Sequence, residues 1–138
     1  MDIKQGVIPM IAYEKGLEAL EWLTKAFGFK ELKRFADKDR LTHGEMDTGN
    51  GIIMLATPSP DYQNPKNHRE NCEYARKWSN VPWIVDGVLV YVNNIQDHFE
   101  KAKRAGAKIL TEVEITPHGS VYRCEDIEGH RWMFVQED

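Results

Sequence analysis

The chain has 138 residues and a net charge of −4, with hydrophobic residues at 41% and charged residues at 29%. This length allows one domain with a sizeable core, and the composition is that of an ordinary globular protein. The acidic balance argues against a general nucleic-acid binder, because a surface that follows phosphates needs an excess of basic residues. No apolar run approaches the roughly 20 residues that a membrane span requires.

The first residues and the two cysteines indicate a compartment. Residues 1–5 lack the apolar core of a signal peptide, and we therefore expect a cytoplasmic protein. Cys72 and Cys124 fit this expectation, because thiols stay free in a reducing compartment. The sequence leaves a disulfide between them open.

An apolar strand is predicted at residues 7–13, and an amphipathic helix follows it. Apolar residues recur in the helix every three or four positions with Glu and Lys opposite them, which is typical of a helix with one buried face. The apolar stripe consists of Leu17, Leu20, Trp22, Leu23 and Phe27. Gly28 comes directly after the stripe and suits a left-handed cap at the end of the helix.

Three short strands are predicted next, at residues 30–36, 41–47 and 52–57. Asn50-Gly51 stands between the last two and is a strong signal for a hairpin turn. His43, Glu45 and Asp47 alternate along the middle strand, so their side chains would share one face of the sheet. That face is either exposed to water or a polar patch in a binding site.

The insert, residues 58–82, breaks this pattern. Residues 58–65 form a turn-rich loop, and one short helix is predicted at 68–79 with Pro82 beyond its end. The insert is too short to be a domain, so it is either a lid or an arm that contacts a second copy.

The second half, residues 87–136, repeats the element order of the first half, residues 7–57. A strand is predicted at 88–92, and the apolar stripe of the helix after it consists of Ile95, Phe99, Ala102 and Ala105. Gly106 ends this helix, and strands are predicted at 108–114, 120–125 and 131–136. The same order at a spacing of about 80 residues indicates an internal duplication of a βαβββ unit.

Two motifs in this order suggest a family. Ala26-Phe27-Gly28-Phe29 follows the first helix, and the acidic turn at 125–130 leads into Arg131 and Trp132. Together with the duplicated βαβββ unit, they resemble the vicinal oxygen chelate superfamily, which includes glyoxalase I, bleomycin-resistance proteins, fosfomycin thiol transferases and extradiol dioxygenases.

The resemblance implies an α+β fold in which residues 1–138 form a single domain. Two βαβββ units would form curved mixed sheets around a cup, with the helices on the convex side. Along the last strand, Trp132 and Phe134 would face the helices and pack in the core against Trp22 or Phe99. Arg131, Met133 and Val135 would face the cup.

Catalytic members of the superfamily hold a divalent metal with His, Gln or Glu side chains from the first and last strands of each unit. The corresponding positions of this sequence are Ile8, Met54, Val88 and Met133. None of these side chains binds a hard divalent ion, and a one-residue shift of the alignment does not supply a ligand. We therefore expect no metal and no other cofactor, and we disfavour glyoxalase, fosfomycin-transferase and dioxygenase activity, which need a Lewis acid.

The first hypothesis is a protein that binds or sequesters a small organic molecule in an apolar cup. The cup would be lined by Ile8, Met10, Met54, Val88, Val90 and Met133, with Arg131 at its edge. His118, Tyr122 and Trp83 would lie near its mouth. The resemblance to bleomycin-resistance proteins also implies a homodimer. The alternative is that the same Met and Val side chains simply fill the cup as core.

The second hypothesis is an enzyme without the usual metal, a lyase, isomerase or transferase that acts on a small carbonyl compound. Its candidate residues are His43, Glu45, His68 and Cys72. His68 and Cys72 are four residues apart on a predicted helix and would share a face, as one edge of a zinc site or as a base and a thiol. A dimeric accessory protein without a small-molecule site is a third, weaker hypothesis.

Overall fold

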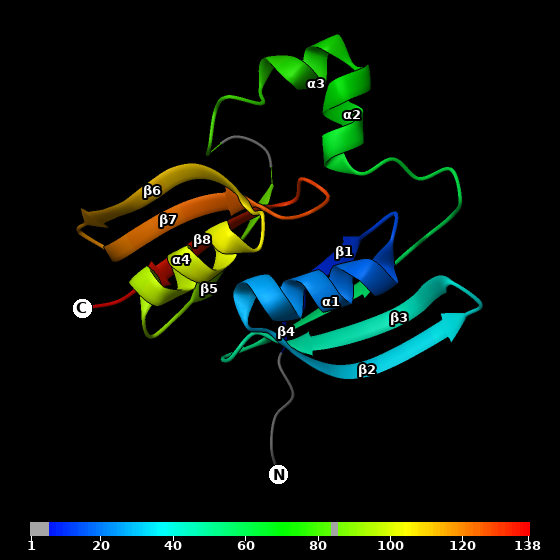
Figure 1. Ribbon diagram of the computed structural model, residues 1–138, viewed down its shortest axis with the longest axis horizontal. Coiled ribbons are helices and arrows are strands. Elements are labelled where there is room, and N and C mark those ends of the chain that lie inside the picture. Colours follow the sequence, from blue (N-terminus) through cyan, green and yellow to red (C-terminus); the bar gives the residue numbers. More distant parts are fainter. Residues whose placement is uncertain (1–5, 84–85) are drawn as a thin grey trace.

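The computed structural model describes residues 6–83 and 86–138 and contains two four-stranded sheets (Figure 1). The first unit contains β1 (Met10–Ala12), α1 (Gly16–Phe27), β2 (Lys30–Asp37), β3 (Arg40–Asp47) and β4 (Ile52–Ala56). The insert contains α2 (Pro65–Asn71) and α3 (Glu73–Lys77). The second unit contains β5 (Gly87–Tyr91), α4 (Ile95–Arg104), β6 (Lys108–Thr116), β7 (Gly119–Glu125) and β8 (Arg131–Gln136).

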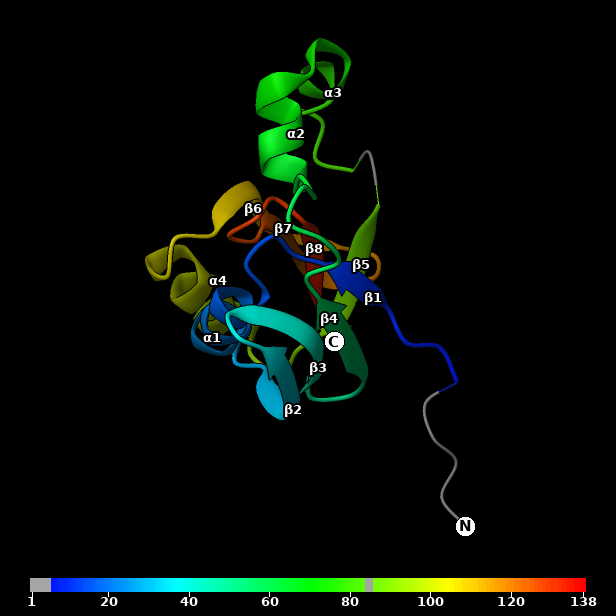
Figure 2. The same ribbon diagram turned by 90° about the vertical axis from the view of Figure 1, so that its right-hand side faces the viewer.

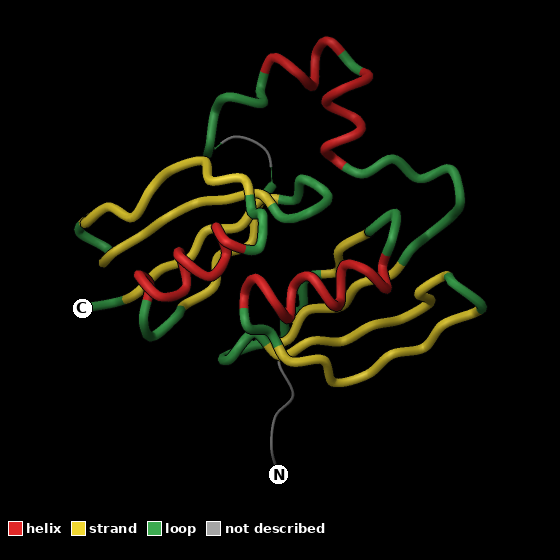
Figure 3. The backbone as a smooth tube through the Cα atoms, in the orientation of Figure 1, coloured by secondary structure: helices red, strands yellow, loops and turns green. Residues whose placement is uncertain are grey.

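The two sheets have the same topology, with strand orders β1-β4-β3-β2 and β5-β8-β7-β6. In each sheet the first and last strands of the unit are parallel neighbours, and the remaining pairs are antiparallel. Figure 3 shows the repeat as two similar sets of yellow strands, each with a red helix in front. The predicted α+β duplication of a βαβββ unit is therefore confirmed.

Both long helices end as their sequences predict. Gly28 follows α1 with a φ of 73° and donates its N–H to the carbonyl of Thr24, which makes it a left-handed cap. Gly106 has a φ of 100° just beyond α4. At the start of α4, the side chain of Asn94 accepts a hydrogen bond from the N–H of Asp97 and caps the helix.

The helices α1 and α4 lie side by side on one side of the molecule, with the strands on the other side (Figures 1 and 2). Each sheet therefore has a covered face, which packs against the helices, and an open face. Alternate residues of a strand point to opposite faces, so burial in the common core identifies the covered face.

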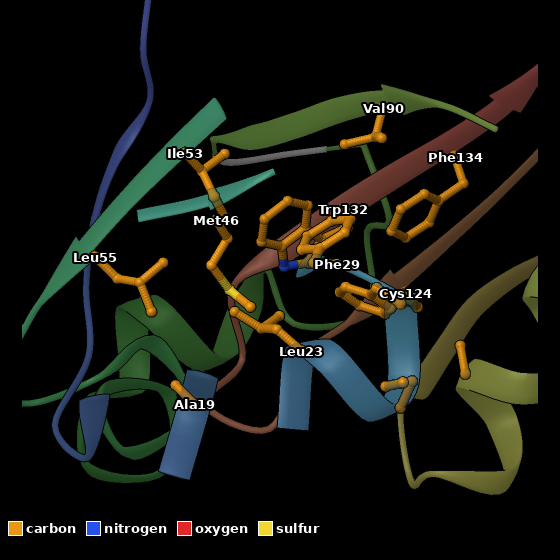
Figure 4. Close-up of a cluster of buried hydrophobic side chains, with 14 of the residues drawn as sticks. Ala19, Leu23, Phe29, Met46, Ile53, Leu55, Val90, Cys124, Trp132 and Phe134 are labelled. Atoms are coloured by element: carbon orange, nitrogen blue, oxygen red, sulfur yellow. The ribbon is translucent and has the colours of Figure 1, made fainter. Parts of the chain in front are cut away.

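Aromatic rings join the two units in the core. Phe27 at the end of α1 contacts Trp132 and Phe134 of β8, with ring centroids 5.4 and 4.8 Å apart. Figure 4 shows Trp132 and Phe134 among side chains from both units. Trp132 is 1% exposed, so its predicted place in the core is confirmed, although it contacts Phe27 and Phe29 rather than Trp22 or Phe99.

Two local predictions differ from the structure in the first unit. The first strand covers three residues, 10–12, rather than 7–13. The predicted hairpin exists, but its turn spans residues 48–51, and Gly49 rather than Gly51 has the positive φ, of 110°. The N–H of Thr48 donates to the carbonyl of Gly51, and the N–H of Gly49 donates to the Asp47 carboxylate, which together close the wider turn.

The insert contains two short helices rather than the single predicted one. Asn64 caps the start of α2 by accepting a hydrogen bond from the N–H of Asn67. Cys72 separates α2 from α3 with extended angles, φ −131° and ψ 120°. His68 and Cys72 therefore do not share a helical face, and the prediction that they do is wrong.

Candidate functional site

The open faces of the two sheets carry matching positions, because both units have the same strand register. In the first unit, Met10 pairs with Met54, and Met54 also pairs with Glu45 of β3. In the second unit, Leu89 pairs with Met133, and Met133 also pairs with Arg123 of β7. Each face thus presents two apolar side chains beside one charged side chain, and the charge is negative in the first unit and positive in the second.

Of the four positions assigned to the metal ligands of catalytic relatives, Met54 and Met133 lie on the open faces, Val88 lies on the covered face and Ile8 precedes β1. The strand neighbours on the open faces are Met10 with Met54 and Leu89 with Met133. Aliphatic side chains have no lone pair, and a thioether prefers soft ions such as copper(I) to hard divalent ions. Among the residues that the structure describes, no group of three or more His, Cys, Asp or Glu side chains is placed to hold a metal ion.

The structure divides the predicted cup residues between the two faces. Met10, Met54 and Met133 lie on the open faces, and Met10 is 81% exposed. Ile8 precedes β1 and is half-buried. Met54 and Met133 are also half-buried.

Val88 and Val90 lie on the covered face of β5, so their predicted place in the cup is corrected. Val90 is 4% exposed and belongs to the common core, and Val88 packs against that core. Val88 pairs with Trp132, which faces the helices. The alternate residues Leu89 and Tyr91, each 47% exposed, lie on the open face instead. All four side chains are apolar or aromatic, and so the sequence pattern did not reveal which pair faces the core.

Arg131 differs from its predicted role as a charged contact at the edge of the cup, because it is only 6% exposed and its guanidinium group has partners within the chain. It forms an ion pair with Glu125, with an N–O distance of 3.0 Å, and donates hydrogen bonds to the carbonyls of Ser79 and Val81. Arg69 of α2 contacts the other oxygen of Glu125 at 2.9 Å. These contacts hold the insert against β7 and β8, so the role of Arg131 is structural.

The three residues predicted near the mouth of the cup lie in different environments. Tyr122 is fully buried on the covered face, which corrects its prediction. His118 is exposed in the turn between β6 and β7. Trp83 is 70% exposed and lines a pocket beside the open face of the second sheet.

A pocket of about 210 Å³ opens on this face of the second sheet. Trp83, Leu89 and Met133 supply its apolar walls, and Arg123 and Arg131 supply positive charge. Its volume is below the roughly 300 Å³ at which ligand pockets usually begin. The described part of the chain therefore forms an open pocket here rather than an enclosed cavity.

The open face of the first sheet carries the side chains of His43 and Glu45. The Nε2 atom of His43 lies 2.8 Å from the Glu45 carboxylate, and Lys33 of β2 is 3.9 Å from the same oxygen. Phe35 lies beside His43, with ring centroids 6.2 Å apart. Glu45 is half-buried and the His43 side chain is 39% exposed, so this strand face is partly open to water.

The acidic turn at 126–130, which the resemblance emphasises, links the end of the chain to its beginning. Glu128 accepts hydrogen bonds from the backbone N–H groups of Glu14 and Lys15, at 2.6 and 2.8 Å, just before α1. The imidazole of His130 lies 2.6 Å from the carbonyl oxygen of Ala12. Gly129 has a φ of 87°, and a Cβ atom there would lie 2.7 Å from the backbone nitrogen of Lys66, so a side chain would collide with α2.

The carboxylate of Asp126 lies at the centre of this turn. It accepts hydrogen bonds from the Tyr13 hydroxyl at 2.6 Å and from the Trp132 indole at 3.0 Å. Burial raises the pKa of Asp126, although the charge of His130 and these hydrogen bonds oppose the shift. Burial and the nearby Asp126 charge also raise the pKa of Tyr13. We assign the turn a structural role, which the sequence showed only as a motif.

Sequence reasoning missed a second buried polar pair, beneath α4. The Nδ1 atom of His98 lies 2.6 Å from the Tyr122 hydroxyl, and its Nε2 atom lies 3.1 Å from the carbonyl of Phe27. Since a carbonyl only accepts, Nε2 carries the proton and Nδ1 accepts from the tyrosine. Burial lowers the pKa of His98 to about 4 and raises the pKa of Tyr122. The signal available in the sequence was the position of His98 one residue before Phe99 of the apolar stripe.

The cysteines give no catalytic arrangement among the described residues. Cys72 and Cys124 are both free, as the prevailing expectation held. Burial raises the pKa of Cys124, which keeps its thiol protonated at neutral pH. Within the same described residues, no helix is both long enough and apolar enough to cross a membrane.

Comparisons with known proteins agree with this architecture. The family model described as "Glyoxalase/Bleomycin resistance protein/Dioxygenase superfamily" matches residues 10–134. No curated protein matches the sequence.

Several solved structures are similar over nearly their whole length. TioX from Micromonospora sp. ML1 is 27% identical, with a TM-score of 0.71 and 97% of each chain covered. TnmS3, an antibiotic binding protein from Streptomyces sp. CB03234, is 13% identical, with a TM-score of 0.68, and 100% of this chain and 99% of that chain are covered. The bleomycin-binding protein of Streptomyces verticillus, solved with copper(II)-bleomycin, is 14% identical, with a TM-score of 0.61 and 100% of each chain covered.

Proposed function

The chain belongs to the Glyoxalase/Bleomycin resistance protein/Dioxygenase superfamily, and we propose that within it this protein binds a small organic molecule without a metal. The observation that carries the proposal is the chemistry of the open faces. Met10 lies beside Met54 in the first sheet and Leu89 lies beside Met133 in the second, on the strands where catalytic relatives hold their ion. Methionine side chains adapt to irregular ligands, and such a surface favours binding over Lewis-acid catalysis.

Two fold relatives support this proposal by their ligands. TnmS3 is an antibiotic binding protein, and the protein from Streptomyces verticillus binds bleomycin. Their sequence identities of 13% and 14% establish a shared fold alone. The ligand of this chain is therefore proposed only as a small organic molecule, held on the open sheet faces rather than in the helix-side core.

We also propose that the protein is a homodimer in which open faces of two copies come together. Met10 is 81% exposed, Phe35 is 58% exposed, and Leu89 and Tyr91 are each 47% exposed. Exposed apolar side chains on the open faces of both sheets favour an interface with another copy. The pocket beside Leu89 and Met133 lacks one wall, and a second copy would supply it.

A thermal-shift screen tests the proposed function. Glycopeptide antibiotics, aromatic compounds and thiol conjugates are added in turn, and a ligand is expected to raise the melting temperature because it stabilises only the folded state. Leu89→Lys places a charge in the pocket and should abolish the shift. Ile115→Lys is the matched control, since Ile115 is 86% exposed and does not line the pocket.

Two further measurements test the proposal, the mass of the protein in solution and its metal content. Light scattering after gel filtration is expected to give twice the mass of the chain. Metal analysis of the purified protein is expected to find less than stoichiometric zinc or nickel. A stoichiometric ion at the open faces, or no ligand-dependent shift across the screen, would contradict the proposal.

One observation favours the second hypothesis, an enzyme that acts on a small carbonyl compound. The His43–Glu45 pair on the first open face has the geometry of a histidine oriented by a carboxylate, with a separation of 2.8 Å. Such a histidine can accept a proton from a substrate. His43→Gln should abolish any turnover found with small carbonyl compounds, and unchanged turnover in this variant would remove the pair from the mechanism.

A further inference from the structure

We propose that Arg123 anchors an anionic group, so that the pocket on the second sheet takes small aromatic acids. The inference rests on the proposed function and deepens it, because it names the chemical class of the ligand. It also replaces Arg131, the predicted charged contact, with a different residue of the same open face.

The position of Arg123 follows from the register of β7. It pairs with Met133 on one side and Thr111 on the other. Its neighbours in the chain, Tyr122 and Cys124, are both fully buried in the common core. Since alternate residues face opposite ways, the Arg123 side chain lies on the open face, where it lines the pocket and is half-buried.

The arginines near this face differ in their partners. Arg131 and Arg69 both form ion pairs with Glu125. Within residues 6–83 and 86–138, the guanidinium group of Arg123 makes no hydrogen bond and no ion pair. A half-buried guanidinium has five N–H donors that point in fixed directions, and a carboxylate satisfies two of them at once. The unsatisfied donors of Arg123 therefore match a ligand carboxylate or a similarly shaped anion.

The other walls of the pocket indicate the rest of the ligand. Trp83, Leu89 and Met133 surround the position of Arg123. Aromatic rings pack on such side chains, and methionine sulfur makes favourable contacts with ring edges. Asp86 also lines the pocket and is exposed, so its negative charge disfavours a ligand with several negative charges. A flat aromatic molecule with a single acidic group fits these features together.

The first sheet supports the assignment by contrast. Glu45 occupies the position there that Arg123 occupies in the second sheet, since each pairs with the methionine of the last strand. A carboxylate beside Glu45 would be repelled, with Lys33 3.9 Å away as a partial counter-charge. An anionic group is therefore directed to the second sheet, and only the apolar part of the ligand suits the first.

A matched pair of compounds tests the inference by isothermal titration calorimetry on the whole protein. The probes are 2-naphthoate and its neutral analogue 2-naphthamide, which share the ring system and differ in charge. Wild type is expected to bind the acid at least about tenfold more tightly than the amide, because a charge-assisted bidentate contact is stronger than a neutral one. Arg123→Gln should remove this preference and leave amide binding within about twofold, while Arg123→Lys should keep part of it.

Arg104→Gln is the control variant, because Arg104 is an exposed cation at the end of α4 and does not line the pocket. It should retain the full preference for the acid. Equal binding of acid and amide by wild type, or a preference that survives in Arg123→Gln, would overturn the inference and leave the proposed function standing. If neither compound binds to wild type, the inference and the proposed pocket both fail.

Discussion

The two units share one topology but differ in what surrounds their open faces. Their registers are the same, and so each face carries an apolar pair beside a charged residue, Glu45 in the first unit and Arg123 in the second. In the first unit the charge is partnered by His43 and Lys33. In the second unit Arg131 forms an ion pair with Glu125 and donates a hydrogen bond to the carbonyl of Ser79 in the insert.

A duplicated backbone thus repeats the positions of side chains without repeating their roles. The register determines which side chains stand together, since hydrogen-bonded strands cannot slip by one residue without exchanging their faces. The charge at each position is free to differ, because the open face is not part of the core.

The largest expected effect tests whether the aromatic core truly joins the units. Phe134 is fully buried and contacts Phe27 of the other unit, so Phe134→Ala should lower the free energy of unfolding by about 3–5 kcal/mol. Leu55, the equivalent residue of β4, is 2% exposed, and Leu55→Ala should cost about 2–3 kcal/mol. Urea denaturation measures both, and a single transition is expected in each variant. A second transition in either would show that the units unfold separately.

A smaller effect is expected from the turns before the last strands, since the turn at 126–130 contacts the start of α1 and the turn at 48–51 is more exposed. Glu128 closes the start of α1 from the far end of the chain, and Glu128→Gln loses one of its two acceptor oxygens. This change should lower the free energy of unfolding by about 1–2 kcal/mol, because a partly buried N–H loses its charged acceptor. Asn50→Ala, in the exposed turn of the first unit, should stay within about 0.5 kcal/mol. Equal losses for the two variants would remove the structural role assigned to the acidic turn.

Acidity should affect the second unit through His98. Its folded pKa of about 4 lies below the unfolded value of 6.5, so the unfolded state binds the proton first as the pH falls. The stabilisation is complete above pH 6.5 and is lost between pH 6.5 and pH 4, by roughly 2 kcal/mol after allowance for partial exposure.

Asp126 changes stability in the opposite direction, since burial raises its folded pKa and favours the protonated carboxyl in the folded state. Its contribution is present at low pH and decreases as the pH rises through the folded value. The His98 effect is therefore measured as a difference, with urea denaturation of wild type and His98→Gln at pH 7 and pH 4.5. The two proteins should converge at the lower pH, and parallel losses would contradict the assignment.

The smallest expected effect concerns the apolar pairs that the units share. Addition of equimolar nickel or zinc should shift the melting temperature by less than about 1 °C, because no ion would bind the folded state preferentially. Magnesium serves as the control for ionic strength. A clear rise with nickel or zinc alone would reverse the chemical argument made from Met54 and Met133.

Much of the fold was predictable because it depends on local patterns. The stripes of the two helices, the glycines after them and the strand order of each half are confirmed. The helix of the insert was not predicted correctly, because Cys72 adopts extended angles that no residue nearby signals. The turn at 48–51 differs for a similar reason, since side-chain contacts of Asp47 select a wider loop than Asn50-Gly51 alone favours.

The candidate site was predictable only in part. The mismatch between a hard ion and the four positions assigned to its ligands, Ile8, Met54, Val88 and Met133, follows from residue types. It does not depend on the register, because Val88 and Leu89 are equally unsuited to an ion. The prediction of which β5 side chains face the cup did depend on the register, and it assigned Val88 and Val90 to the wrong face. A strand whose two alternating sets are both apolar gives no period-two contrast from which to choose.

The sequence alone predicts the duplicated units, the ends of their helices and the lack of hard-ion ligands at Met54 and Met133, because these features depend on residue type and short spacing. Packing between distant segments determines which arginine has partners among the described residues. Arg131 has them, and the guanidinium group of Arg123 does not. Arg131 and Arg123 lie on the same open face, but the insert brings the carbonyls of Ser79 and Val81 to Arg131, some 50 residues along the chain. Such contacts arise from packing between distant segments, and no local pattern records them.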